Sequence, residues 1–442
     1  MGDQIPERKE YYFISDLHIG GDGELGQVHF KEEMITFLKS LESHDKDTEL
    51  IIAGDAFGLW EFTSCEGVDQ LRCIAAENPE LFEQLKKTGE KIVITVIPGN
   101  HDHDLAAFDG FKELMMEFNM SLETTLSVER KIGNSLIWIE HGHQYDNMNR
   151  IEQFGDPASR PFGYFITRYV LSMAGQRSRL GRRSWLSDIE CVQPNEELPK
   201  WALSNYFYKE MNPFLRFIIV PIVLFITFAA VFLVFSVLGL LGIGNLDARI
   251  LETLQNWGII GRIIEVWLII DVVLLQILIL ISIPLLFFYK DVNAALKRYG
   301  FKFDRKDLMK KREIYLNHAR QVLSTHPHRK IFVFGHTHNP LLINEGGKVI
   351  LNTGTWLERH SYVRATFPLM PPVYYHSFQL NYFRVYKPDS KIRIEYCVIP
   401  KEVNNKLTLL ERFATALSRK PGPISIPPVT EIEDLDQKNT ST

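Results

Sequence analysis

Five short polar clusters, each directly after an apolar, strand-like run, constrain this chain more than any other feature. They are Asp16-Leu17-His18, Gly54-Asp55, Gly99-Asn100-His101-Asp102, His141-Gly142-His143 and Gly335-His336-Thr337-His338. A buried strand that ends in polar side chains holds them rigidly at the edge of a sheet. One such cluster is weak evidence, because the same residues are common in turns. Five in the same setting predict a single site built from distant segments.

The chain between these clusters alternates strand-like and helical patterns. Strand-like runs cover 12–14, 49–53, 91–97, 135–140, 330–334 and 348–351, and a hairpin pattern covers 382–385 and 391–397. Helical patterns cover 30–41, 78–87, 105–118 and 304–324. Strands alternating with helices, with polar clusters where strands end, predict an α/β layered fold with its site on one edge.

Length, charge and cysteine content narrow the class of protein. A chain of 442 residues can form two or three domains with a sizeable core. Its formal net charge of -5 argues against non-specific nucleic-acid binding, and no long basic groove of the kind a nuclease needs is visible. The four cysteines are scattered, which predicts no disulfide framework and a reducing compartment. The polar first ten residues lack the apolar core of a signal peptide.

The middle of the chain changes in texture. From 145 to 211, arginines interleave with aromatic residues. An isolated run of this kind would be read as a solvated helical face. Here it leads directly into an apolar stretch, where the same composition anchors helices to anionic headgroups or binds phosphates.

Two apolar runs predict a transmembrane hairpin. Residues 217–241 are almost wholly apolar and exceed the roughly 20 residues needed to cross a bilayer core. The second run, 263–288, has four interruptions: Glu265, Asp271, Gln276 and Pro284. Asp271 has two interpretations, a charge paired inside the membrane or a residue near the interface before the span begins. The connecting residues 242–262 have a loose apolar spacing that fits a small interfacial helix.

Basic residues predict the orientation of this hairpin. Lys209 and Arg216 precede the first run and Lys290 and Lys297 follow the second, whereas the connection carries few basic residues. The positive-inside rule therefore places both long flanks in the cytoplasm. Polar clusters lie on both sides of the hairpin, so both flanks must meet in one domain. Two crossings allow this, and a hairpin that dips into one leaflet is the alternative.

The polar clusters have the chemistry of a two-metal site. Carboxylate, imidazole and amide ligands together suit manganese, iron or zinc better than calcium or magnesium, and manganese is our first choice. Two cations about 3.5–4 Å apart can clamp an in-line displacement at phosphorus. With these motifs, the chain resembles the calcineurin-like metallophosphoesterase family over about 11–150 and 330–400. The resemblance implies a four-layer α/β/β/α sandwich and a hydrolase of phosphoester or pyrophosphate bonds, with a hydroxide activated by two metal ions as nucleophile.

The resemblance also implies roles for individual residues. The first metal would be held by Asp16, His18 and His338, the second by Asn100, His141 and His336, and Asp55 would bridge the two. His101 would stabilise the transition state or protonate the leaving oxygen, and Asp102 would orient His101. His143 either supports a ligand or is a polar residue of the turn. Many family members carry a second carboxylate three residues after the bridging one, where this chain has Gly58.

The residues that follow Asp55 suggest a class of substrate. Residues 54–61 resemble the bacterial UDP-diacylglucosamine pyrophosphatases, which also insert a helical lid between the motifs matching His141 and His336. A membrane-seated lid suits a phosphorylated lipid or a nucleotide-linked lipid, with its phosphate at the bilayer surface. The alternatives are a membrane-tethered phosphatase or phosphodiesterase of soluble nucleotides, and a non-catalytic scaffold.

The predicted organisation has five parts. They are the first part of the metallophosphoesterase domain (1–150), a basic aromatic helical lid (151–213), the two-helix transmembrane hairpin (214–290), the second part of the domain (291–418) and a disordered tail (419–442).

Overall fold

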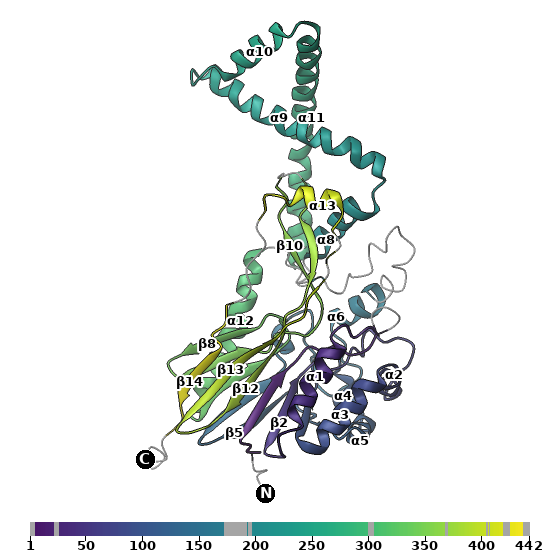
Figure 1. The fold of residues 1–442 in the computed structure, drawn as a ribbon, viewed down its shortest axis with the longest axis vertical. Coiled ribbons are helices and arrows are strands. Elements are labelled where there is room, and N and C mark those ends of the chain that lie inside the picture. The colour runs from purple at the N-terminus through teal and green to yellow at the C-terminus, as the bar shows by residue number, and fades with distance from the viewer. Residues whose placement is uncertain are drawn as a thin grey trace.

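The computed structural model describes residues 5–21, 26–171, 192, 197–298, 305–366, 370–403, 405, 407–418 and 425–435. Two β-sheets and their covering helices form one end of the molecule, and three long helices extend from the other end (Figure 1). The first and last described strands, β1 and β14, both lie at the sheet end. This mixed α/β architecture confirms the predicted α/β class.

The larger sheet has seven strands in the order β14-β13-β12-β1-β2-β3-β4. Their bounds are β1 Glu10–Ile14, β2 Thr48–Ala53, β3 Val93–Ile97, β4 Ser121–Leu122, β12 Leu380–Tyr386, β13 Lys391–Ile399 and β14 Val429–Glu433. Strands β1 to β4 run parallel, with Phe13 beside Ile51, and β12 pairs with β1 antiparallel. The larger sheet therefore joins residues from both sides of the long insertion.

The smaller sheet has five strands in the order β5-β6-β7-β9-β8. Their bounds are β5 Ser127–Ile132, β6 Ser135–Glu140, β7 Arg329–Phe334, β8 Leu341–Glu345 and β9 Lys348–Asn352. Strands β6 and β7 are parallel neighbours although nearly two hundred residues separate them, and Ile139 pairs with Val333. The two flanks of the insertion therefore meet in one domain, as the distribution of the polar clusters required.

The alternation of side chains along the strands builds the layers. In β1, Tyr11 and Phe13 join the cluster between the sheets, whereas Tyr12 and Ile14 join the cluster under the helices. The helices of that outer layer are α1 Lys31–Leu41, α2 Asp69–Glu77, α3 Pro79–Lys91, α4 Asp104–Ala107 and α5 Gly110–Glu117. Helix α12, Arg305–Thr325, covers the smaller sheet through Leu316 and Leu323. The layers thus run helix, sheet, sheet, helix.

Two predictions for this domain need correction. The tail predicted to be disordered from 419 contains β14, which pairs antiparallel with β13 and buries Ile432. The alternation of residue types in Val429–Glu433 favours a strand, but it is short, and the Pro- and Ser-rich residues before it favour disorder. Cys65 and Cys73 are joined by a disulfide with Cα atoms 7.1 Å apart, although no disulfide was predicted. Cys397 is free.

The predicted helix over 105–118 forms as two helices. Phe108 adopts an extended backbone with φ −130° and ψ 120°, which ends α4 at Ala107 before α5 begins at Gly110. The predicted helices over 30–41 and 304–324 are confirmed by α1, which begins one residue later, and by α12, which is shifted by one residue at both ends.

The insertion contains three long helices at the end of the molecule away from the sheets (Figure 1). They are α9 Pro213–Leu240, α10 Leu246–Asn256 and α11 Gly258–Arg298. Among the described residues, the stretch Gly258–Phe288 of α11 is long and apolar enough to cross a membrane, and Ile226–Leu240 of α9 is a shorter apolar helix. The first predicted span includes residues of α9 whose side chains lie outside the description, so a two-span hairpin remains a proposal.

A small two-stranded sheet and several short helices connect the insertion to the domain. The strands β10 Arg359–Val363 and β11 Val373–Ser377 form an antiparallel hairpin. Helix α8 Leu198–Asn205 packs on it through Trp201, and the π-helical turn η8 Tyr206–Glu210 leads from α8 toward α9. Helix α13, Leu409–Ala414, lies in the same region (Figure 1). In the predicted lid, the structure describes α6 Phe162–Phe165 and η3 Ile166–Leu171, while 172–191 lie outside the description.

Candidate metal centre

The five polar clusters converge at one edge of the paired sheets. Asp16 and Asp55 follow β1 and β2 by two residues, and Asn100 follows β3 by three. His141 follows β6 directly and His336 follows β7 by two residues. The carboxyl ends of parallel strands share an edge, and the apolar layer between the sheets brings the two edges together.

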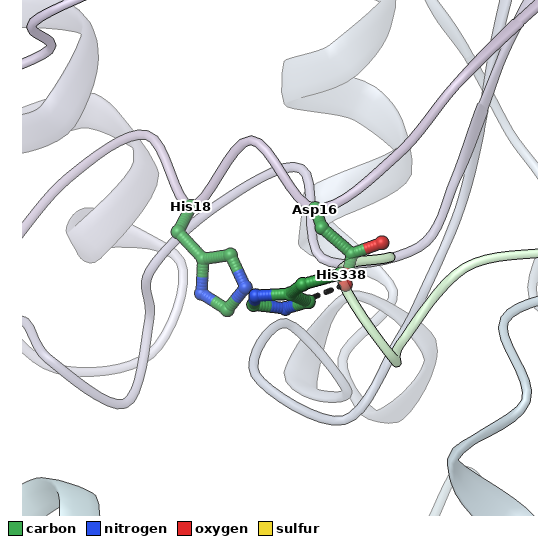
Figure 2. A group of neighbouring side chains, drawn as sticks. All are labelled: Asp16, His18 and His338. Atoms are coloured by element: carbon green, nitrogen blue, oxygen red, sulfur yellow. Dashed lines mark ion pairs between the residues drawn. The ribbon is translucent and has the colours of Figure 1, made fainter. Parts of the chain in front are cut away.

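The first group of candidate ligands is Asp16, His18 and His338 (Figure 2). Asp16 Oδ1 lies 3.0 Å from His338 Nε2. Asp16 is fully buried, and its carboxylate also accepts from the His336 backbone N–H at 3.0 and 3.1 Å. Ser15 Oγ contacts the same carboxylate and lies 2.6 Å from Thr353 Oγ1. These contacts fix Asp16 in one orientation.

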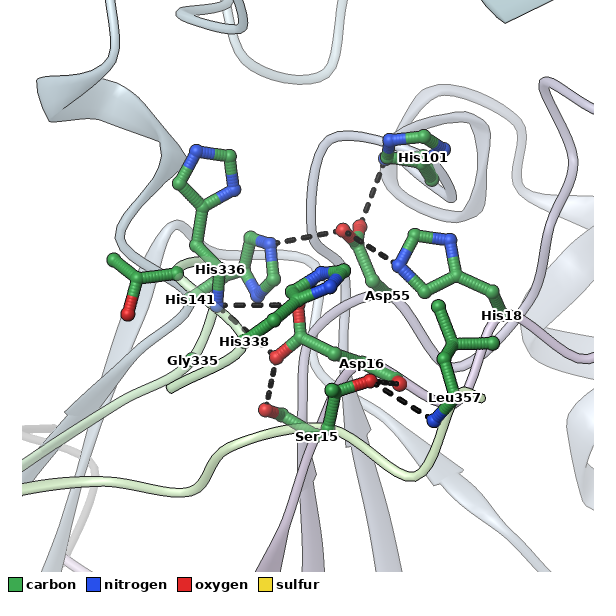
Figure 3. Close-up of polar contacts among 12 residues, drawn as sticks. Ser15, Asp16, His18, Asp55, His101, His141, Gly335, His336, His338 and Leu357 are labelled. Atoms are coloured by element: carbon green, nitrogen blue, oxygen red, sulfur yellow. Dashed lines mark hydrogen bonds and ion pairs between the residues drawn. The ribbon is translucent and has the colours of Figure 1, made fainter. Parts of the chain in front are cut away.

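Asp55 lies between the first group and a second one, which contains His141 and His336 (Figure 3). Asp55 Oδ2 is 3.1 Å from His141 Nε2 and 3.6 Å from His18 Nε2. Asn100 Oδ1 is 3.2 Å from the same His141 nitrogen. A carboxylate between two ligand groups has the placement that a bridging ligand requires.

Two glycines of the motifs make this convergence possible. A Cβ on Gly99 would lie 2.1 Å from Asp55 Oδ1, and one on Gly54 would lie 2.1 Å from His141 Nδ1. Gly54 also has φ +93°, a backbone conformation that side chains other than glycine rarely adopt. Each glycine therefore leaves room for a candidate ligand from another strand.

Backbone strain is concentrated at the same place. Among the residues that the structure describes, six other than glycine have positive φ: Asp16, His18, Asp55, Asn119, His336 and His338. All but Asn119 are candidate ligands. Such a conformation costs on the order of 1–3 kcal/mol and persists only where surrounding contacts enforce it. The clustering indicates that function, and not stability, selects these backbone conformations.

The side chains fit a pair of metal ions. Within the described residues, three sets of ligand atoms lie within 4.8 Å of one another: Asp16-His18-His338, His18-Asp55-His101 and Asp55-His141-His336. Two buried ring nitrogens of the first group, His18 Nε2 and His338 Nδ1, have no hydrogen-bond partner among the described residues, as suits atoms that bind a cation. Imidazole nitrogens and carboxylate oxygens are common ligands of transition metals. The assignment of each of these residues to one of the two metal ions remains a prediction.

The charges of the site are strongly coupled. Burial disfavours the charged form of Asp55, yet the neighbouring His141 holds the pKa of this carboxyl well below its usual range. Burial likewise opposes charging of His141, but Asp55 and Asp16 raise its pKa to about 10. Burial and the nearby Asp55 raise the pKa of Asp102 to about 7. Asp55 is thus held as an anion, the form in which a carboxylate binds cations, whereas the raised pKa of Asp102 favours its neutral form.

The contacts of Asp102 do not match its predicted role of orienting His101. Its Oδ2 accepts from the backbone N–H groups of Ala56 and Phe57 at 2.7 and 3.2 Å, and its Oδ1 accepts from Gly99 N–H at 2.6 Å. Asp102 therefore ties the Gly54-Asp55 loop to the Gly99-Asn100 loop. Asp102 thus positions the backbone of these two loops. The His101 ring has a different partner.

That partner is Glu61, which sequence reasoning missed. Glu61 Oε1 lies 2.6 Å from His101 Nδ1 and 3.6 Å from His18 Nδ1. Burial would raise the pKa of Glu61, but His101 and His18 lower it to about 2. An acidic residue in the apolar stretch after Asp55 was the available signal. Glu61 follows Asp55 by six residues, whereas the second carboxylate of many family members follows the bridging one by three. For this reason the role of Glu61 was not predicted.

Two further residues beside the second group complete the description. Asp146 Oδ2 lies 3.4 Å from His336 Nε2. His143 is fully buried, neither of its ring nitrogens has a hydrogen-bond partner, and its ring lies 5.6 Å from that of His141. Burial holds its pKa well below the usual value, so His143 is a neutral imidazole in the wall of the site.

One comparison with protein families agrees with this geometry. Residues 10–203 match the model of the calcineurin-like phosphoesterase family. The family implies metal-dependent phosphoester hydrolysis and typically binds two divalent metals, although some members are not catalytic. His336 and His338 lie outside the matched residues and reach the site through β7.

Two solved structures are similar to this chain. A single-residue mutant of Vps29 from Entamoeba histolytica has 11% identity and a TM-score of 0.28, with 88% of this chain and 92% of that chain covered. The phosphopantetheinyl hydrolase PptH from Mycobacterium tuberculosis has 12% identity and a TM-score of 0.25, with 79% and 90% covered. Neither likeness bears on function. Comparison with curated proteins returns no match.

Proposed function

We propose that this chain is a hydrolase of phosphoester or pyrophosphate bonds that uses two divalent metal ions and acts on a lipid-linked or membrane-surface substrate. The observation that carries the chemistry is the convergence of carboxylate and imidazole ligands within 4.8 Å of one another, from separate loops at one sheet edge. Membrane context rests on the apolar insertion between the two halves of the domain.

Asp16, His18 and His338 would hold the first ion, Asn100, His141 and His336 would hold the second, and Asp55 would serve both. When bound, the ions supply an activated water as nucleophile and positive charge for the phosphoryl oxygens. Manganese suits this mixed ligand set best, with iron and zinc as alternatives.

The residues of the chain supply the proton. Glu61 accepts from Nδ1 of His101 at 2.6 Å, which leaves Nε2 as the nitrogen that can protonate the leaving oxygen. Asp102 holds the two loops that carry Asp55 and Asn100 at a fixed separation. His101 is thus the acid in this proposal, Glu61 sets its tautomer, and Asp102 positions backbone.

The insertion would seat the enzyme in a membrane. In this proposal α9 and α11 form two spans and α10 lies at the far interface, with both flanks of the insertion in the cytoplasm because basic residues such as Lys209 and Lys290 flank it. A membrane-seated enzyme favours a phosphorylated lipid or a nucleotide-linked lipid as substrate. The resemblance of residues 54–61 makes a UDP-diacylglucosamine-type pyrophosphate the first specific candidate.

A metal-supplemented activity screen tests the proposal. Purified full-length protein is assayed with manganese, iron or zinc against lipid pyrophosphates, soluble nucleotides and model phosphodiesters, with His101→Ala as the inactive control. We expect metal-dependent turnover, fastest on lipid pyrophosphates. Faster turnover of nucleotides would indicate a tethered soluble-substrate enzyme, and no turnover with any metal would indicate a scaffold.

A further inference from the structure

Among the described residues of the predicted lid, Tyr164 contacts the catalytic machinery through the aromatic ring of Trp60. This ring lies 4.4 Å from the ring of His101, tilted by 32°. Tyr164 of α6 also meets the Trp60 ring edge-on, with centroids 5.6 Å apart and an angle of 87°. Trp60 is only 2% exposed, so it transmits contact between the two rings without water between them.

Among the described residues, Glu61 and His18 also contact the His101 ring. Glu61 fixes Nδ1 within the plane of the ring, and the ring of His18 packs edge-on at 4.5 Å. Neither contact fixes the tilt of the imidazole on the side of Trp60. The contact with Trp60 therefore limits the tilt of the His101 ring, and with it the direction of Nε2.

Two arginines of the lid segment fix Tyr164. The guanidinium carbons of Arg160 and Arg168 lie 4.7 and 5.8 Å from the centre of its ring. Arg160 also pairs with Asp104, at 2.8 Å to Oδ1 and 3.1 Å to Oδ2. Arg168 Nη1 donates to the carbonyl of Phe62 at 3.3 Å.

These anchor points are the neighbours of the catalytic residues. Asp104 follows His101 by three residues, and Phe62 follows Trp60 by two. The lid segment therefore grips the chain on both sides of the His101–Trp60 pair and places one ring against it. An element that served only to cover the domain would not need contacts concentrated at this pair.

We infer that Tyr164 is a positioning residue, through which the lid holds Trp60 against His101 and so aligns the proton donor with the leaving oxygen. The inference rests on the proposed function, because it assigns the lid to the proton-transfer step of that reaction. It also predicts that displacement of the lid slows leaving-group protonation while the metal ligands stay in place.

The test compares leaving groups that need a proton with leaving groups that do not. Wild type, Tyr164→Ala and Tyr164→Phe are assayed on phenyl and dinitrophenyl phosphates and on the matching methyl phosphodiesters. A general acid contributes roughly 10²–10⁴-fold when the leaving group is poor, so a misaligned acid should lower kcat on the phenyl esters about ten-fold. On dinitrophenyl esters we expect a change of less than about two-fold. Tyr164→Phe keeps the ring and should retain wild-type ratios.

Tyr169→Ala is the matched control. Tyr169 is an exposed ring of the same segment that stacks on Phe165, 6.3 Å between centroids. It should leave the ratio of the two rates unchanged. Equal loss on both esters in Tyr164→Ala, or no loss on either, would overturn the inference while leaving the hydrolase intact. A wild-type protein that hydrolyses none of these esters with any metal would overturn the proposed function, and this inference with it.

Discussion

The sheet domain and the α9–α11 insertion are both rich in aliphatic residues but use them in opposite ways. Ile51 and Ile137 in the sheets are fully buried, whereas Leu240 and Ile259 in the insertion are 89% and 79% exposed. The domain provides its own apolar environment between two sheets, and this rigid core places the loops of the metal centre. The insertion exposes apolar surface that a membrane would cover in the proposed function. The geometry of the site therefore depends on packing within the chain. The attachment of the insertion, in contrast, depends on what surrounds the protein.

The largest expected effect comes from placing a charge in each region. Ile51→Asp puts an unpaired carboxylate between the sheets, which costs several kcal/mol and should abolish the folded state. Ile277→Asp in α11 alters a residue that is 46% exposed and should leave the domain folded. It should weaken membrane insertion by about 2.5–3.5 kcal/mol. Protease resistance measures the first effect and the membrane-bound fraction the second; equal unfolding in both variants would break the comparison.

The next effect concerns the metal centre alone. Asp55→Asn removes the charge of the carboxylate that contacts both ligand groups, and we expect turnover to fall by about three orders of magnitude, roughly 4 kcal/mol of activation free energy. Metal content, measured by mass spectrometry, should fall from two ions per chain. The thermal midpoint of the metal-free protein should stay close to that of metal-free wild type. Retained turnover would remove the bridging role of Asp55.

Glu61→Gln should give a smaller loss with two components. Its carboxylate contacts the Nδ1 atoms of both His18 and His101, so the variant should weaken metal binding and lower kcat by about 10–100-fold, as for other partners of metal ligands. Glu66→Gln, an exposed carboxylate in the same loop, is the control. Titration with manganese separates the two components. Unchanged affinity and rate would reduce Glu61 to a packing residue.

The same contrast explains what sequence could predict. The strands that carry the polar clusters were located because their residues are buried on both faces, and an apolar run before a polar cluster is a local signal. The convergence of Asp16 with His338 followed from their shared setting and from the family resemblance. Glu61 and Trp60 were missed as partners of His101 because ring packing and hydrogen bonding across loops leave no periodic signal in the sequence.

The C-terminal strand shows the limit most clearly. Residues 429–433 alternate too briefly to stand out beside the Pro- and Ser-rich segment before them. Strand β14 forms because β13 offers a paired edge and because the following Asp434 is anchored to the smaller sheet. Neither partner is adjacent in sequence, so local propensity could not reveal them.

The smallest expected effect tests this anchor. Asp434 accepts from Ser135 Oγ at 2.6 Å and from Asn134 N–H at 3.1 Å, and it pairs with Lys387. Asp434→Asn should therefore lower the free energy of unfolding by about 1–2 kcal/mol at pH 7. Hydrogen exchange of the Val429–Glu433 amides should rise before that of β1 does. Glu433→Gln, which removes an exposed pair with Lys391, should change stability by less than about 0.5 kcal/mol.

Acid should loosen strand β14 in the wild-type protein as the Asp434→Asn substitution does. Burial raises the pKa of Asp434, but Lys387 and the hydrogen-bond donors around it lower it below the ordinary value of 3.8 overall. A carboxyl whose pKa is lower in the folded state stabilises the fold above its unfolded pKa, and this contribution is lost as the pH falls through the folded pKa. The protection factors of the β14 amides should thus stay high at neutral pH and fall below about pH 4. In Asp434→Asn this acid-dependent fall in protection should disappear; if it persists, another group anchors the strand.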